Sequence, residues 1–243
     1  MRIGIMGAME LEINILKKDM QLEEKLKEAG MEFYLGRLEG VEVVLVKSGV
    51  GKVNAGICTQ ILVDRFEIDK LIFTGVAGAI DTALEVEDIV ISTDLVQHDV
   101  DATAYGNRKP GEIPELDKVS FAADEGLVEL AFKVSQEVLK DETNQAYQGR
   151  ILSGDQFISS SQKVKELKET FGGYCTEMEG AAVAQAAYLN NLPFVIIRSI
   201  SDKADEEADI SFDEFAEIAA QHSYKIVIAI LEETEGDSFG KNN

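Results

Sequence analysis

Carboxyl groups, an arginine and a serine occur close together in the last third of the chain, and we place the candidate chemistry there. Glu177 and Glu179 open this stretch, and Arg198, Ser201 and Asp202 close it. Such side chains can hold a polar ligand and move its protons. The competing interpretation is a charged helix start followed by a solvated strand end.

A predicted helix and a predicted strand separate the two polar groups. The segment from Gly180 to Leu189 is rich in alanine and has Val183 as its one β-branched residue, which favours a helix packed closely on a sheet. Residues 194–197 are all apolar and predict a buried strand. Residues 198–202 would then lie at the carboxyl end of that strand, where open α/β sheets bind ligands.

Composition limits the classes of partner. The chain has 243 residues, 45% of them hydrophobic, and its net charge of -22 disfavours binding to nucleic acids or to anionic membranes. Cys58 and Cys175 form no CxxC motif and are predicted to be reduced core residues of a cytoplasmic protein. No apolar stretch approaches the roughly 20 residues of a membrane span, and no secretion signal is recognised.

Three glycine-rich turns punctuate the first third of the chain, at residues 7–9, 48–52 and 74–79. Each follows an apolar, strand-like run, but neither the GxGxxG nor the GxxxxGK[ST] spacing of a phosphate-binding loop is met. We therefore expect close packing of the turns on a sheet. The repeated strand and helix units predict one α/β domain over residues 1–231, with a mixed, mostly parallel sheet covered by helices, and a polar tail over 232–243.

The remaining elements are predicted from local patterns. Residues 22–30, LEEKLKEAG, are helical by propensity, with strand pairing as the alternative, and a hairpin is expected from 33–38 and 41–47. Helices are expected over 124–141 and from 209 to about Leu231. His98, Asp99 and Asp101 are too few to predict a metal site, so we expect none. Glu12 lies in the first turn of a helix, where an acid is usually a capping or dipole group.

Eight motifs together resemble a known family. They occur in the family's order and approximate spacing: GIMGAMELE, KSGVGKVNA, FTGVAGA, HDVDATAYG, SGDQFI, EMEGAAVA, RSISD and SFDEF. The chain resembles the 5′-methylthioadenosine/S-adenosylhomocysteine nucleosidases, within the purine nucleoside phosphorylase and nucleosidase superfamily, from Met1 to the last helix. The resemblance implies a three-layer αβα fold, a nucleoside substrate, hydrolysis of its N-glycosidic bond and no cofactor.

The resemblance also implies roles for individual residues. Asp202 matches the general acid that shares a proton with N7 of adenine, and Ser201 helps to orient it. Glu12 matches the base that activates water, and Arg198 the cation that helps to hold that water. Glu179 matches the acid that binds the ribose hydroxyls and stabilises a cationic sugar.

Further substrate contacts follow from the same resemblance. Phe157 would stack on adenine, the backbone of Ile158 would read the purine edge, and Met178 would pack on the ribose. Phe212 lies where a neighbouring subunit contributes to the pocket, which implies a homodimer. The remaining implied contacts are Ala8, Met9, Val50, Val76 and Glu177 in the chain itself, and Ala102 and Tyr105 at the subunit boundary.

Val76 departs from the family pattern, which usually carries a serine there. In the phosphorylases of the superfamily, this serine and an arginine two or three residues earlier hold phosphate. Val76 and Phe73 occupy those places here, and neither can bind an anion. Water is therefore the expected nucleophile.

Two other readings stay open. One is a related phosphorylase, or a nucleosidase acting on 5′-deoxyadenosine or 6-amino-6-deoxyfutalosine, which needs the same adenine and ribose contacts. The other is a non-catalytic nucleoside-binding or sensor protein. A binding protein needs no acid and base together, and the presence of Glu12, Glu179, Arg198 and Asp202 disfavours it.

Overall fold

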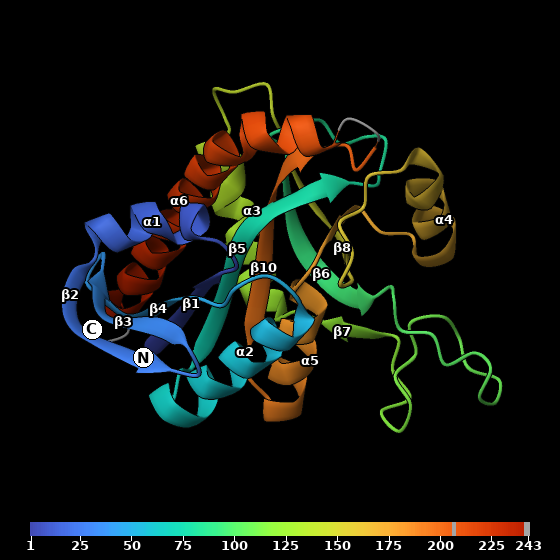
Figure 1. Ribbon diagram of the computed structural model, residues 1–243. Coiled ribbons are helices and arrows are strands. Elements are labelled where there is room, and N and C mark those ends of the chain that lie inside the picture. The colour runs from blue at the N-terminus through green and yellow to red at the C-terminus, as the bar shows by residue number, and fades with distance from the viewer. Residues whose placement is uncertain (206–207, 241–243) are drawn as a thin grey trace.

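A mixed β-sheet of ten strands forms the centre of the molecule (Figure 1). The structure is a computed structural model that describes residues 1–205 and 208–240, without the side chains of 209–214 and 235–240. The strands are β1 (Arg2–Gly7), β2 (Gln21–Glu28), β3 (Met31–Leu38), β4 (Val41–Lys47), β5 (Lys70–Ala79), β6 (Ile89–Gln97), β7 (Ser120–Ala122), β8 (Ala146–Ser153), β9 (Cys175–Glu177) and β10 (Phe194–Asp202).

Strand pairing closes part of this sheet into a ring. The order is β10-β6-β8-β9-β5-β1-β4-β3-β2, with β7 added to β6, and β10 also pairs with β5. Five strands, β5, β10, β6, β8 and β9, therefore form a closed circuit, and β1, β4, β3 and β2 extend from β5. Pairings of both directions occur, which confirms a mixed sheet.

β5 has an interruption in pairing along one edge. On one side it pairs with β10 from Leu71 to Gly78. On the other side β1 pairs with it only as far as Phe73, and β9 joins it at Gly78. The intervening residues of β5 have no strand partner on that edge, and this gap positions the site described below.

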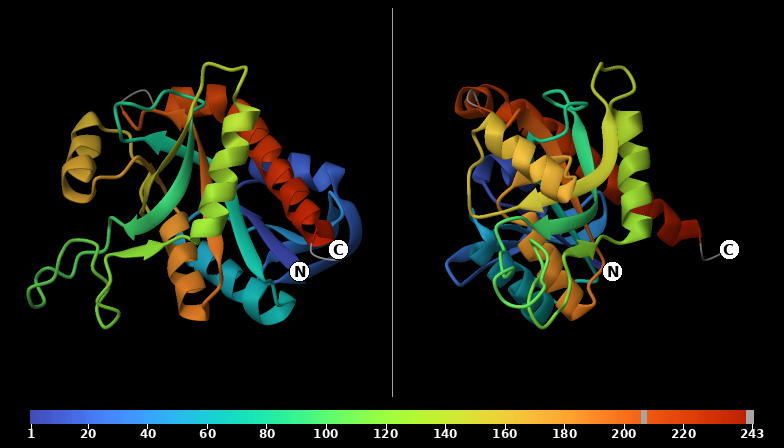
Figure 2. Two further views of the ribbon diagram at one scale, coloured as in Figure 1. Left: turned by 180° about the vertical axis from the view of Figure 1, so that it is seen from behind. Right: turned by 90° about the vertical axis from the view of Figure 1, so that its right-hand side faces the viewer.

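Helices cover both faces of the sheet. They are α1 (Glu10–Asp19), α2 (Lys52–Phe66), α3 (Glu125–Val138), α4 (Ser161–Phe171), α5 (Gly180–Asn190) and α6 (Ala208–Gly240). α1 and α3 pack against α6 on one face, α2 packs against α5 on the other, and the segment between β6 and β7 projects from the body (Figure 2). The predicted α/β domain is thus confirmed. In the part of the chain that the structure describes, no helix is both long and apolar enough to cross a membrane.

Burial of apolar strand residues supplies the core. Ile5, Val44, Leu45, Ile72 and Ile196 are completely buried between the helical layers. Burying a side chain of this size stabilises the fold by roughly 1.5–3 kcal/mol. Both cysteines are buried and free, as predicted.

For residues 22–30 the helix predicted from propensity is wrong, and the strand pairing given as its alternative is correct. These residues form β2 and the start of a hairpin with β3, in which Glu28 pairs with Met31. Ala29 and Gly30 between them both have positive φ, 47° and 82°, as a tight hairpin turn requires. Tertiary pairing with β3 therefore outweighs the helix-forming tendency of Glu, Lys and Leu.

The prediction of a third glycine-rich turn at residues 74–79 is also wrong, because β5 continues through these residues to Ala79. Pairing with β10 along this length keeps the chain extended. Gly75 and Gly78 allow two carboxyl groups to lie close to the backbone of β5. A Cβ at Gly75 would lie 2.5 Å from Glu12 Oε1, and a Cβ at Gly78 would lie 2.7 Å from Asp202 Oδ1. The short strands β7 and β9 and the helix α4 were not predicted, and α6 continues beyond Leu231 to Gly240.

The hairpin makes a prediction about stability. In Gly36→Ala the new Cβ would lie 2.2 Å from the backbone oxygen of Gln21 in β2, which cannot move without disturbing the strand. We expect a loss of about 1–3 kcal/mol in the free energy of unfolding, measured by urea denaturation. Gly126→Ala in the exposed first turn of α3, where the nearest atom is 3.4 Å away, is the control and should show no loss. Equal denaturation midpoints for the two variants would contradict this account.

Candidate active site

A cavity of about 230 Å³ lies at the gap in the pairing of β5. It is bounded by the segment after β1, the carboxyl-terminal part of β5, the ends of β9 and β10, and the segment after β8. The lining residues are Ala8, Met9, Glu12, Val50, Val76, Ala77, Gly78, Gln156, Phe157, Ile158, Thr176, Glu177, Met178, Glu179, Ser201 and Asp202. Most of this wall is apolar, and its charged groups are all carboxyl groups.

Glu12 is held by three backbone amides. Its Oε2 accepts from the N–H groups of Ala8 (2.6 Å) and Met9 (2.9 Å), and its Oε1 from that of Val76 (3.2 Å). Glu12 therefore caps α1, as an acid in a first turn usually does, and also reaches across to β5. Burial raises its pKa above the ordinary value, and the positive charge of Arg198 and the three amides oppose the rise.

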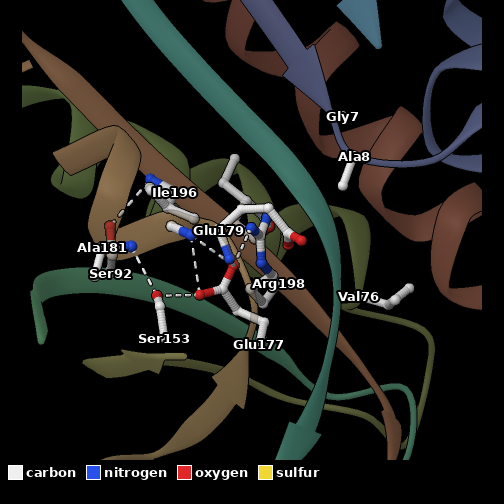
Figure 3. A network of polar contacts seen from close by, with 12 residues as sticks. Gly7, Ala8, Val76, Ser92, Ser153, Glu177, Glu179, Ala181, Ile196 and Arg198 are labelled. Atoms are coloured by element: carbon white, nitrogen blue, oxygen red, sulfur yellow. Dashed lines mark hydrogen bonds and ion pairs between the residues drawn. The ribbon is translucent and has the colours of Figure 1, made fainter. Parts of the chain in front are cut away.

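A buried ion pair joins Glu177, in the cavity wall, to Arg198 behind it (Figure 3). Arg198 donates from Nη2 to Oε2 of Glu177 over 2.6 Å, and the two side chains are only 1% and 4% exposed. Glu177 also accepts from the Ser153 hydroxyl and from the backbone amides of Glu179 (3.1 Å) and Gly180 (2.8 Å). The guanidinium of Arg198 stacks over the Phe73 ring, 4.0 Å from its centre.

Glu179 presents a carboxyl group between α2 and α5. It is 6% exposed, and its Oε1 accepts from the backbone N–H of Gly51 over 2.7 Å. Gly51 precedes α2 with φ at 99°, a backbone conformation that favours glycine. Burial, followed by the nearby Glu177 carboxylate, raises the pKa of Glu179 to about 8.

Asp202 ends β10 on the opposite side of β5 from Glu12. Its Oδ1 accepts from the Ala204 N–H (2.8 Å) and its Oδ2 from the Ser201 hydroxyl (2.8 Å). Burial raises its pKa, and these two hydrogen bonds act against the rise. A carboxyl group whose pKa is raised keeps its proton at higher pH, as a general acid must.

The structure brings most of the predicted residues together. Twelve of the sixteen that were predicted from the sequence line the cavity, and Arg198 stands directly behind them. Ala102 and Tyr105 lie on the projecting segment between β6 and β7 and do not line the cavity of their own chain, where Tyr105 is 73% exposed. Phe212 falls in α6, and its side chain lies outside the described residues.

Four lining residues were not predicted: Ala77, Gly78, Gln156 and Thr176. Ala77 and Gly78 lie inside the FTGVAGA motif and carry no polar side chain that would single them out, and Gln156 lies inside SGDQFI. Thr176 directly precedes EMEGAAVA. Only the pairing of β9 with β5 reveals that it faces the cavity.

The polar groups near His98 take part in a different arrangement. Lys52 donates from Nζ to Oδ1 of Asp99 over 2.5 Å, and the other carboxylate oxygen of Asp99 accepts from the Asp155 N–H. The backbone N–H of Lys52 donates in turn to Asp155. This network ties the start of α2 to the segments after β6 and β8, beside the amide that holds Glu179.

Comparison with known proteins identifies the protein family to which the chain belongs. Residues 2–232 match the model of the Phosphorylase superfamily. A 5′-methylthioadenosine/S-adenosylhomocysteine nucleosidase of Bacillus thuringiensis is 45% identical over 234 residues, which make up 96% of this chain and 99% of that protein.

Solved structures agree with this class. The Neisseria meningitidis 5′-methylthioadenosine/S-adenosylhomocysteine nucleosidase in complex with methylthio-immucillin-A has a TM-score of 0.90 and 41% identity, over 96% of this chain and 99% of that one. The futalosine hydrolase of Helicobacter pylori has a TM-score of 0.88 and 36% identity, over 96% and 97%. The chain belongs to the Phosphorylase superfamily and, within it, to the family of 5′-methylthioadenosine/S-adenosylhomocysteine nucleosidases.

The raised pKa of Glu179 predicts a pH-dependent stability. The folded state binds this proton more tightly than the unfolded chain, so its contribution is complete below pH 4.5 and is lost as the pH rises to about 8. In Glu179→Gln the amide oxygen can still accept from Gly51, but nothing titrates. We expect the variant to gain stability relative to the unmodified protein between pH 4.5 and 8, measured by urea denaturation across this range. Parallel stability curves for the two proteins would show that Glu179 does not titrate in this way.

Proposed function

We propose that this protein hydrolyses the N-glycosidic bond of 5′-methylthioadenosine and S-adenosylhomocysteine, releasing adenine and the 5-thio-substituted ribose. The observation that carries the proposal is the arrangement of Glu12 and Asp202, two buried carboxyl groups that line one cavity, one from the first turn of α1 and the other from the end of β10. The family relationship and the nucleoside names of the relatives support the same substrates.

Departure of the base is assigned to Asp202. Adenine is a poor leaving group as an anion, and a proton shared with its N7 lets it leave neutral. The raised pKa of Asp202 keeps such a proton available, and the Ser201 hydroxyl fixes the orientation of the carboxyl group. General acid catalysis of this kind contributes about 10²- to 10⁴-fold to the rate.

Attack by water is assigned to Glu12. The three amides that hold its carboxylate fix its position, and Arg198 lies close enough to lower its pKa against the effect of burial. The places that bind phosphate in the phosphorylases hold Val76, on the cavity wall, and Phe73, beneath Arg198. Neither side chain can bind an anion, and this supports water as the nucleophile.

Stabilisation of the sugar is assigned to Glu179. In its ionised form, which predominates above its pKa of about 8 in the ligand-free protein, its carboxylate would bind the ribose hydroxyls and offset the positive charge that develops on the ring as the bond breaks. Met178 supplies an apolar wall beside it. Phe157, which is 53% exposed, would stack on the adenine, with the Ile158 backbone reading its edge.

A second candidate is hydrolysis of a related nucleoside such as 6-amino-6-deoxyfutalosine or 5′-deoxyadenosine. The similarity to a futalosine hydrolase, at 36% identity, supports this second candidate. The adenine and ribose contacts would be the same, and only the 5′ end of the pocket would differ. The relative rates on these nucleosides and on 5′-methylthioadenosine separate the two candidates.

The decisive experiment is adenine release from 5′-methylthioadenosine by the purified protein, with and without phosphate. Release without phosphate, giving free methylthioribose, is expected. Cleavage that requires phosphate and yields the sugar 1-phosphate would show that the inference from Val76 and Phe73 is wrong. Absence of cleavage in both buffers would favour another 5′-substituted nucleoside or a binding protein.

We further propose a cytoplasmic homodimer that serves methionine salvage. Large apolar side chains are exposed at the cavity (Val50 and Phe157), on α2 (Val53 and Ile57) and on the segment between β6 and β7 (Tyr105). A second copy covering this surface would bring Ala102, Tyr105 and Phe212 to its partner's pocket. Light scattering should give twice the mass of 26.6 kDa, and a monomer at assay concentration would contradict the dimer.

Asp202→Asn tests the general acid. The amide cannot donate a carboxyl proton, so turnover should fall by about a hundredfold or more while substrate binding is largely kept. Single-turnover cleavage and the dissociation constant of the substrate would be measured on the same preparation. Asp141→Asn, at an exposed position after α3, should leave both unchanged. Near-normal turnover by Asp202→Asn would remove this mechanism.

Glu12→Gln tests the base in the same assay. Hydrolysis should be abolished because the amide cannot take a proton from water, and circular dichroism should still show a folded protein. Glu10→Gln, in the exposed part of the same first turn, is the matched control and should remain active. Full activity of Glu12→Gln would point to another base.

A further inference from the structure

Thr176 carries a hydroxyl group with no partner in the wall of the cavity. Its Oγ1 is buried and makes no hydrogen bond within the described residues, and the residue is 5% exposed. Buried polar groups are nearly always paired, so an unpaired one needs an explanation. Thr74, Ser199 and Ser223 also have unpaired buried hydroxyls, but none of them lines the cavity. Thr176 is the one of these four residues that lines the cavity.

Strand register fixes the side of the sheet on which the Thr176 side chain lies. Thr176 pairs directly with Gly78 of β5 and with Leu152 of β8. Side chains of directly paired residues lie on the same face of a sheet. A Cβ at Gly78 would point to Asp202 Oδ1, 2.7 Å away, and to the Cβ of Ala204, 2.9 Å away. Thr176 therefore faces the side of Asp202.

The pairing of Thr176 with Leu152 places Thr176 at the same end of the cavity. Leu152 belongs to a small apolar cluster with Ile158 and Ala204. Ile158 lines the cavity next to Phe157. Glu177, one residue further along β9, also lines the cavity, but its carboxylate is bound to Ser153 and Arg198. Thr176 thus lies in the half of the cavity that contains Asp202, away from the buried ion pair.

We propose that the Thr176 hydroxyl is a hydrogen-bonding contact for the purine base and helps to select it. This rests on the proposed function, in which Asp202 receives the base. A purine offers ring nitrogens that accept and an exocyclic amino group that donates, and a hydroxyl can pair with either. An apolar residue at this place would accept any flat ring of suitable size. A hydroxyl left unpaired by the wrong base disfavours that base.

The test is adenine binding by T176V and T176S, measured by isothermal titration calorimetry. Valine keeps the shape of threonine and removes the hydroxyl, so adenine should bind about three- to tenfold more weakly. Serine keeps the hydroxyl and should bind within about twofold of the unmodified protein. The affinity for methylthioribose should not change in either variant. The thermal midpoint of ligand-free T176V should not fall, because the lost hydroxyl had no partner.

The outcomes separate this contact from the proposed function. Unchanged adenine affinity in T176V overturns the contact and leaves the hydrolase standing. Equal weakening of adenine and methylthioribose overturns it as well, since the effect would then be a general disturbance of the cavity. An unmodified protein that neither binds adenine nor releases it from a nucleoside overturns both proposals.

Analogues of adenine locate the contacted atom. In one set a carbon replaces each ring nitrogen in turn, and in purine the amino group is absent. The penalty of T176V should disappear for the one analogue that lacks the contacted group, because neither protein can then form the bond. A penalty that persists for every analogue would overturn a direct hydrogen bond.

Discussion

The buried carboxylate of Glu177 is the interaction on which the site depends. It accepts hydrogen bonds from Ser153 at the end of β8, from the first amides of α5 and from Arg198 on β10. Withdrawing two charges from water costs several kcal/mol for each ion, and the hydrogen bonds to both oxygens of the Glu177 carboxylate offset part of this cost, although Nε of Arg198 is buried without a partner among the described residues. The N-terminus of α5 adds its partial positive charge. One side chain thereby fixes the relative positions of two strands and a helix.

This arrangement also governs the electrostatics of the cavity. Glu12, Glu177 and Glu179 lie around a single buried guanidinium, within the residues that the structure describes. Arg198 is committed to Glu177, so the other two carboxyl groups are only partly compensated, and burial raises the pKa of both. A protein with a net charge of -22 thus raises the pKa of selected carboxyl groups by excluding water from them.

Most residues of the candidate active site could be predicted from the sequence because they lie in short contiguous motifs. EMEGAAVA and RSISD carry Glu177, Glu179, Arg198 and Asp202, and the patterns around them predicted α5 to within one residue and the first four of the nine residues of β10. Pairing across long distances could not be read in the same way. The conversion of residues 21–28 into a strand, the passage of β5 through its glycines, and the position of Thr176 all depend on partners far away in the sequence. Local propensity carries no information about these partners.

The closed ring of strands has a consequence for the order of folding during synthesis. β5 is completed early in the chain, but its partner β10 ends at Asp202, after more than four-fifths of the residues have been made. Until β10 emerges from the ribosome, one long edge of β5 and one of β6 lack their strand partner. Unpaired edges of this kind favour association between chains. Protection of the nascent chain by chaperones should therefore matter most just before the residues of the active site are complete.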